Sequence, residues 1–334
     1  MYFNLVTYQF QLPLILTKLE RILLNRTPLA FVLKKTKLLY LPGFDGVPLY
    51  DVLVFFYKQI KTVGLTERAS AVAYNFIMAI PPSFLFLFTL IPNLPFIKKV
   101  TIKKELHALI TDIVPAKVHN DNLIKFVDSF IDDSKIGLLS FGFILALYFA
   151  SNAMMGLMRS FNKNYIGFEK RKGFFHDRLV AIRLTALIFL LVLGCIIMLI
   201  TQGAVLKLVG IQSATVREII FYVRWVFIVS IIFYSIAFIY KFAPAVKERW
   251  KLISPGTILA TTLSITASLG FSYFVNNFGR YNALYGSIGT ILVLMALIYI
   301  NSLVILIGFE LNVSIKSLKL IAEQRKLDEK NKLL

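Results

Sequence analysis

An all-α, polytopic membrane protein with six transmembrane helices is the fold class that this sequence predicts. The chain of 334 residues is 57% hydrophobic and only 16% charged, whereas soluble domains usually carry about 25% charged residues. Residues 288–307 are twenty residues without a charge, and at about 1.5 Å per residue they cover a hydrocarbon core of about 30 Å. No soluble fold of this length has room to bury so much apolar surface.

Hydropathy windows of about 19 residues place the spans near residues 69–92, 136–158, 180–203, 219–242, 254–275 and 285–309. Six spans put both termini on one side of the membrane. Of the 37 Lys and Arg residues, 25 lie in segments on that side and ten on the other. The positive-inside rule therefore predicts cytoplasmic termini. The net charge of +19 is assigned to the cytoplasmic segments, and membrane lipids rather than nucleic acid are the predicted partners.

Residues 1–68 are predicted to form a cytoplasmic N-terminal region. Residues 1–40 interleave Lys and Arg with short apolar runs and show no small-residue cleavage site, so no cleavable signal peptide is predicted. Residues 47–61 place four apolar side chains on one helical face: Leu49, Leu53, Phe56 and Ile60. This pattern suits a helix at the membrane surface and equally a helix packed on the cytoplasmic end of the bundle.

The first span, within a transmembrane domain predicted at 69–312, holds Pro81 and Pro82 near its middle. Prolines remove backbone donors, so the helix is predicted to kink or break there. Broken helices at membrane depth occur where protein or a watery cavity satisfies the freed carbonyls, often at transporter sites. Tyr74, Asn75 and the two prolines are therefore candidate residues of a substrate pathway. A bent helix packed in the bundle is the alternative.

The loop at 93–135 is predicted to form a small external cap of two amphipathic helices separated by Pro115. In the second span, Asn152 is a candidate for bonding between helices and also a pathway candidate. In the fifth span, small residues recur every four positions at Gly256, Ala260, Ser264, Ser268 and Ser272. Such a stripe lets another helix approach closely, which favours packing over a pore lining. The partner is either a helix of this chain or a second copy, so a homo-oligomer stays open.

The sixth span carries two polar residues that need an explanation. Asn301 lies about 6 Å from the middle of the uncharged run and is a pathway candidate buried in the hydrocarbon layer. Glu310 lies about 18 Å from that middle, beyond the half-thickness of about 15 Å, so it is placed at the cytoplasmic rim. An ion pair with Arg178 or Arg183 is one interpretation, and a gate or substrate contact is the other. A basic cytoplasmic tail follows at 313–334.

Enzymatic chemistry has little support in this sequence. His107, His119 and His176 are scattered and pair with no acid at metal-ligand spacing. A phosphate-binding glycine-lysine loop, a GxSxG motif and a His-Glu pair on a helix are all missing. No catalytic residue, metal site or cofactor is predicted.

Several stretches carry a family resemblance: 69–82 with Ala73-Tyr74, 158–164 with Asn162, 176–185, 240–244 with Pro255-Gly256, and 285–312 closing on Gly308, Glu310, Leu311 and Asn312. Through them the chain resembles the YihY/virulence factor BrkB family of bacterial inner-membrane proteins over about residues 50–315. The family tends to have Gly-Ala-Glu where this chain has Gly-Phe-Glu at 308–310. The resemblance implies a six-helix inner-membrane protein, with lipid movement as a family hypothesis. The ribonuclease label carried by some members looks like a misassignment.

Two functions are weighed. The first is a transporter or flippase-like protein for a lipid, an amphiphile or an anionic solute, suggested by the prolines of the first span, the intramembrane polar residues and the external cap. The alternative is a non-catalytic membrane scaffold or dimerising interaction protein, in which the small-residue stripe binds a partner.

Overall fold

The computed structural model describes residues 39–90, 136–162, 165–169, 173–208, 214–277 and 280–332, together with the single positions 103, 104, 107, 124, 125 and 128. Six helices in this part of the chain are long and apolar enough to cross a membrane. The described ranges contain no strand, and Phe168 and Val246 form one isolated β-bridge. The predicted all-α class with six spans is confirmed.

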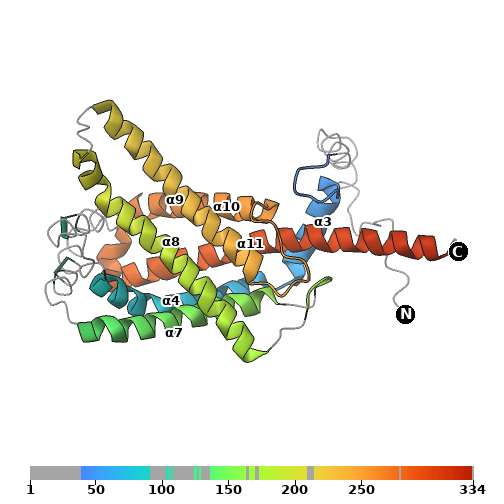
Figure 1. Ribbon diagram of the computed structural model, residues 1–334, viewed down its shortest axis with the longest axis horizontal. Helices are drawn as coiled ribbons and strands as arrows, with labels where there is room; N and C mark the ends of the chain where they lie inside the picture. Colours follow the sequence, from blue (N-terminus) through green and yellow to red (C-terminus); the bar gives the residue numbers. More distant parts are fainter. Residues whose placement is uncertain are drawn as a thin grey trace. The chain divides into compact units, whose positions relative to one another are not determined.

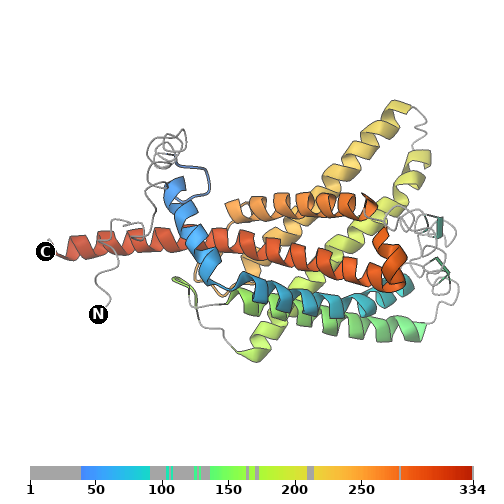
Figure 2. The ribbon, with the colours of Figure 1, turned by 180° about the vertical axis from the view of Figure 1, so that it is seen from behind.

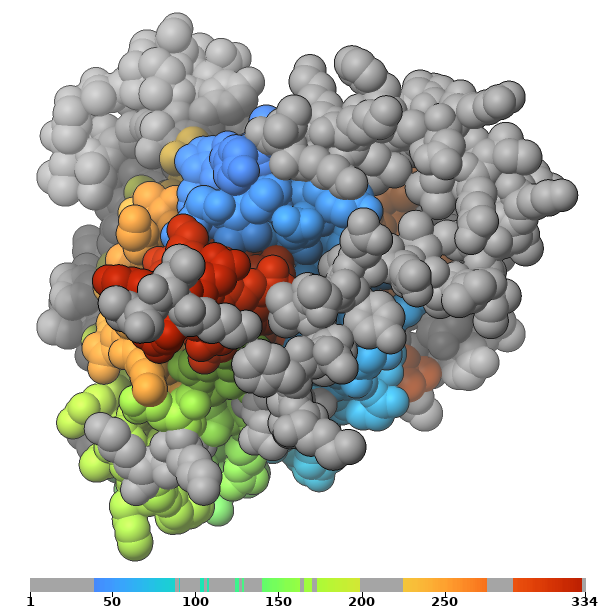
Figure 3. Space-filling model, turned by 90° about the vertical axis from the view of Figure 1, so that its right-hand side faces the viewer, coloured from blue at the N-terminus to red at the C-terminus, as the bar shows by residue number. Residues whose placement is uncertain are grey.

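The helices follow one another as α3 (Leu49–Thr62), α4 (Leu65–Leu90), α7 (Ile136–Phe161), α8 (Phe174–Leu208), α9 (Ala214–Phe242), α10 (Pro255–Asn277) and α11 (Arg280–Lys332). The chain divides into two compact units, one of Met1–Gln59 with Ser314–Leu334 and one of Ile60–Val313. The boundaries predicted at 68 and 312 stay predictions. In the first unit, Lys319 and Asp45 approach to 3.8 Å, and atoms of the blue N-terminal segment lie against red atoms of α11 (Figure 3).

The second unit holds the spanning helices. Here α4 packs on α7, α7 on α8, α8 on α9 and α9 on α10. Figures 1 and 2 show that α8 and α9 run obliquely to α4, α7 and α10. Large apolar side chains on the outer faces, such as Phe141, Ile144 and Leu190, are exposed. Such faces suit contact with lipid tails, because lipid is as apolar as the side chains.

The core of this unit gathers where α7 and α9 end and where α8 and α10 begin; we call this the core end of the bundle. Phe161 and Phe309 stack with ring centroids 4.0 Å apart, and both are fully buried. The Tyr240 hydroxyl, also buried, donates to the Ile305 carbonyl at 2.6 Å. Aromatic burial supplies large apolar area, and the hydroxyl meets its partner without water.

Helix α4 corrects one prediction. It runs from Leu65 to Leu90 without interruption and contains both Pro81 and Pro82. The predicted break is absent: φ near about −65° is an ordinary helical value for proline, and the helix continues although each ring loses a donor and crowds the carbonyl four residues earlier. Nearby, the Ser83 hydroxyl donates to the Ala79 carbonyl at 2.7 Å. The predicted external cap at 93–135 falls almost wholly outside the described residues, although the helical positions His107 and Asp128 approach to 3.0 Å.

Candidate functional site

A buried ion pair joins α4 to α11 at the core end. Arg68 Nη1 donates to Glu310 Oε1 at 2.6 Å, and the side chains are 8% and 0% exposed. The Tyr165 hydroxyl donates to the same carboxylate oxygen at 2.6 Å. Arg68 Nη2 donates to the Ser160 carbonyl at the end of α7. Two chain segments therefore converge on the carboxylate of a third, in the charge-assisted geometry that makes hydrogen bonds strong, and the end of α7 is tied in through Arg68.

This arrangement corrects the predicted ion-pair partner of Glu310. The carboxylate lies inside protein, and its partner is Arg68 rather than Arg178 or Arg183. Matching residues by depth along the membrane normal gives several arginines at one level and does not say which helices are neighbours. Arg68 stands just before the first apolar run, so it was counted among the cytoplasmic charges. Its position directly before that run was the signal available in the sequence.

Tyr165 is partly buried. Burial, and next the charge of the adjacent Glu310, raise the pKa of Tyr165 well above its usual value. The ring packs edge-on against Phe168 at 5.0 Å. Its hydroxyl therefore stays a donor to the carboxylate throughout the physiological range.

Arg178 and Arg183 have other surroundings. Arg178 donates to Asn152 Oδ1 and lies 5.1 Å from the centre of the Tyr148 ring. This contact links α8 to α7, so Asn152 forms a hydrogen bond between helices, which is one of the two roles predicted for it. Arg183 is exposed.

The small-residue stripe of α10 packs on α11 of the same chain. Gly256 N donates to Asn312 Oδ1 at 2.9 Å, and Asn312 Nδ2 donates to Ser254 Oγ at 2.9 Å. A Cβ added at Gly256 would lie 2.1 Å from the Gly308 carbonyl oxygen, so the two backbones meet without room for a side chain. The small-residue stripe suggested a docking surface for a scaffold, and its contact with α11 of the same chain accounts for it.

Asn301 lies farther along this same seam. The Ser264 hydroxyl donates to Asn301 Oδ1, and Asn301 Nδ2 donates to the Leu297 carbonyl at 3.0 Å. Ser268 accepts a longer bond of 3.5 Å from the amide. Ser272, the last member of the stripe, is exposed. The partners of Asn301 explain how an amide is tolerated at this depth.

The six pathway candidates have different surroundings. Tyr74 is 60% exposed on the outside of α4, and Pro81 is exposed too. Asn75 donates to the Ala71 carbonyl at 2.7 Å and faces Gly156 of α7. Asn75, Asn152 and Asn301 each take part in a contact between helices, and a shared pathway through the six candidates stays a prediction.

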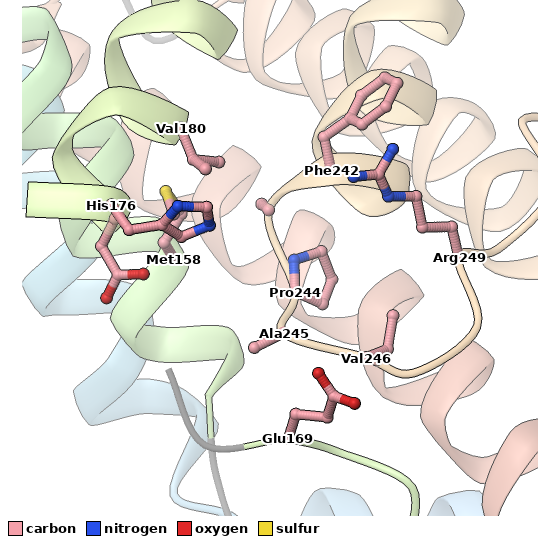
Figure 4. Close-up of a pocket in the computed structure, with 11 residues that line it drawn as sticks. Met158, Glu169, His176, Val180, Phe242, Pro244, Ala245, Val246 and Arg249 are labelled. Carbon is pink, nitrogen blue, oxygen red and sulfur yellow. The ribbon is translucent and has the colours of Figure 1, made fainter. Parts of the chain in front are cut away.

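A pocket opens at the core end instead, and sequence reasoning missed it. Its volume is about 160 Å³. Its apolar wall is made by Met158, Val180, Phe242, Ala243, Pro244, Ala245 and Val246, and its ionisable rim by Glu169, His176, Asp177 and Arg249. Figure 4 shows His176 across from Pro244, with Arg249 beside Phe242 and Glu169 below Val246. Three of the stretches that carry the family resemblance meet here, which was the signal that could have located it.

Two loops build this pocket. Glu169 N donates to the Ala245 carbonyl at 2.8 Å, and Phe168 forms the β-bridge with Val246. The segment 165–169 therefore carries Tyr165, bonded to Glu310, at one end and Glu169, on the pocket rim, at the other. The buried pair and the pocket share one short stretch of backbone. Among the described residues, no three His, Cys, Asp or Glu side chains group as metal ligands.

Comparisons with known proteins agree with this architecture. The model of the family described as virulence factor BrkB matches residues 56–333. A putative ribonuclease-like protein, YfkH, of Bacillus subtilis is 29% identical over 273 residues, which cover 79% of this chain and 93% of the relative. A UPF0761 membrane protein of Haemophilus influenzae is 23% identical over 264 residues, 77% of this chain and 92% of the relative. No solved structure matches the chain significantly. With six helices able to span a bilayer and a family match over most of its length, the chain is a multi-pass membrane protein that belongs to the virulence factor BrkB family.

Proposed function

We propose that this chain is a non-enzymatic protein of the inner membrane, with both termini in the cytoplasm, that moves a lipid or another amphiphile across the bilayer. The pocket at the core end is the observation that carries the proposal. Apolar residues form its wall and ionisable residues its rim. Such a division matches a molecule with a polar headgroup and an apolar body.

The depth of the pocket supports a lipid-like ligand. His176 and Asp177 lie in the first turn of α8, whose spanning segment starts at Phe174, and Phe242 ends the spanning segment of α9. Ends of spanning segments lie at the level of lipid headgroups. A headgroup therefore reaches this pocket by lateral movement from the membrane.

The buried pair is the proposed anchor of the moving part. Glu310 and Arg68 hold Tyr165, which begins the segment that ends at Glu169 on the pocket rim. Release of this carboxylate from either partner would free the segment and change the pocket. Glu310 thus acts on the ligand through Tyr165, as a gate rather than as a contact.

Ribonuclease chemistry is not proposed. That word belongs to the name of one relative, and the described residues hold no acid or histidine cluster of the metal-binding kind. A scaffold keeps no specific support either, because the stripe that suggested it packs on α11.

Reconstitution tests the proposal. The full chain is placed in liposomes of the native lipid classes that contain a trace of fluorescent phospholipid, and inward or outward movement is followed by chemical quenching of the outer leaflet. Ala245→Trp fills the pocket and is expected to reduce movement to the rate of protein-free vesicles. Ile253→Trp is the matched control, since Ile253 is 68% exposed nearby and does not line the pocket. Movement by the unmodified chain no faster than in protein-free vesicles would sink the proposal.

A further inference from the structure

We propose that the pocket binds a zwitterionic headgroup, with its phosphate at Arg249 and its ammonium at Glu169 and Asp177. The inference rests on the proposed function and names the chemistry of the substrate. Its basis is the mixture of charges that surround one small volume.

The charges on the rim disfavour a purely anionic ligand. Two carboxylates, Glu169 and Asp177, line the pocket, against one guanidinium, Arg249, and the imidazole of His176. An anion that meets Arg249 shares the pocket with these two acids, and like charges in one site repel. A ligand with an ammonium a few atoms from its phosphate meets both signs at once.

Two of these groups are available for a ligand. The Glu169 and Arg249 side chains are exposed, and neither has a hydrogen-bond or ion-pair partner within the described ranges. The guanidinium of Arg249 lies 5.3 Å from the centre of the Phe242 ring, with Lys241 Nζ 5.6 Å from the same ring. The Phe242 ring thus holds the Arg249 guanidinium on one side of the pocket. Glu169 lies on another side in Figure 4.

The size of the pocket limits the ligand to a headgroup. Its volume is about 160 Å³. Sites for drug-sized molecules span about 300–1,000 Å³. A phosphoethanolamine-like group fits this space, and the acyl chains of a lipid would stay in the membrane. Met158, Val180 and Phe242 then contact the apolar part next to the headgroup.

The test is a binding measurement on the purified full chain in detergent, by calorimetry with three probes. Two are short-chain lipids with identical acyl chains, a dihexanoyl phosphatidylethanolamine and a dihexanoyl phosphatidylglycerol, and the third is glycerophosphoethanolamine, which has no acyl chains. The zwitterionic lipid is expected to bind at least about tenfold more tightly than the anionic one, since a charged hydrogen bond contributes about that factor or more. Affinity for glycerophosphoethanolamine equal to that of the lipid identifies a free zwitterionic solute as the ligand source, whereas much weaker affinity identifies a lipid.

Variants make the inference specific. Glu169→Gln is expected to abolish the preference for the zwitterion, and Arg249→Gln to weaken both lipids about tenfold. Lys247→Gln and Glu248→Gln are matched controls, because both residues are exposed in the same loop and outside the pocket lining. Elution as a single species in size-exclusion chromatography checks folding. If Glu169→Gln does not fold, the weaker binding expected of Arg249→Gln tests the inference instead.

Equal or tighter binding of the anionic lipid by the unmodified chain would overturn the inference, as would an unchanged preference in Glu169→Gln. These outcomes are distinct from failure of the proposed function. Selective binding with no movement in vesicles would remove the transport proposal alone. Movement in vesicles with anionic selectivity in the binding assay would remove only the inference.

Discussion

Alanine at Gly256 or Gly308 is expected to force α10 and α11 apart. A Cβ at position 256 would lie 2.1 Å from the Gly308 carbonyl oxygen and 2.6 Å from Asn312 Oδ1. A Cβ at position 308 would lie 2.5 Å from the Gly256 carbonyl oxygen. Carbon and oxygen normally approach to about 3.3 Å, so the two backbones must separate by about 1 Å. Backbone atoms on both sides leave no flexible side chain to absorb the overlap.

The structure gives the size of the loss. Overpacking of this kind costs about 1–3 kcal/mol. The separation also breaks two buried bonds of Asn312, one from Gly256 N and one to Ser254 Oγ, both 2.9 Å long. At about 1 kcal/mol for each bond, the expected loss for Gly256→Ala is about 3–5 kcal/mol.

Thermal unfolding of the purified protein in detergent, followed by intrinsic fluorescence, measures this loss. A domain of 150–250 residues loses about 2–4 °C of Tm per kcal/mol, so Gly256→Ala should lower Tm by about 6 °C or more. Gly270→Ala is the control on the same helix, because a Cβ there meets nothing within 4 Å. If the two variants unfold at the same temperature, the reasoning about the close approach of α10 and α11 is refuted.

Three further predictions concern the Arg68–Glu310 ion pair, Tyr165 and the stripe of α10. Glu310→Leu leaves the Arg68 guanidinium buried without its carboxylate, which is expected to lower the free energy of unfolding by about 3–5 kcal/mol. Much of this loss should be recovered in the Arg68→Met/Glu310→Leu double variant. A double-mutant cycle of thermal unfolding that shows no coupling would contradict the ion pair. Since the pKa of Tyr165 is raised in the folded protein, its contribution to stability is complete below the unfolded pKa of about 10 and is lost as pH rises toward the folded pKa. Tyr165→Phe should therefore flatten the fall of Tm above about pH 10, and identical slopes in the two proteins would count against this. Ser264→Leu should lower Tm because leucine meets Asn301, whereas leucine at exposed Ser272 should not; equal Tm values would show that the stripe faces outward.

The pairing of Glu310 illustrates how far sequence reasoning reached. Depth along the membrane normal can be counted residue by residue, and it placed the carboxylate and several arginines near one level. Choosing among Arg68, Arg178 and Arg183 depends on helix rotation and on which helices are neighbours, which no periodicity encodes. Asn301 shows the same limit: its need for a partner was predictable from its depth, while Ser264 as that partner was a matter of packing.

The stripe on α10 was recognisable as a packing surface because residues four apart share a helix face. Its occupant, α11, was not, since a helix of this chain and a second copy offer the same close fit. The prolines of α4 misled for a different reason. The prediction considered only the backbone N–H groups that the prolines lack. The helical turns on both sides keep α4 continuous across them.

The sequence by itself determined the class of protein, the number of spans and the family resemblance. The length of an apolar run decides whether a helix can span a bilayer, and this length can be counted along the chain. Only the tertiary structure decided that Arg68 holds Glu310, that Gly256 meets Gly308, and that the loops at 165–169 and 243–249 enclose a pocket of mixed charge. Each of these brings together residues from separate helices or loops, and their meeting is set by how the helices pack in three dimensions.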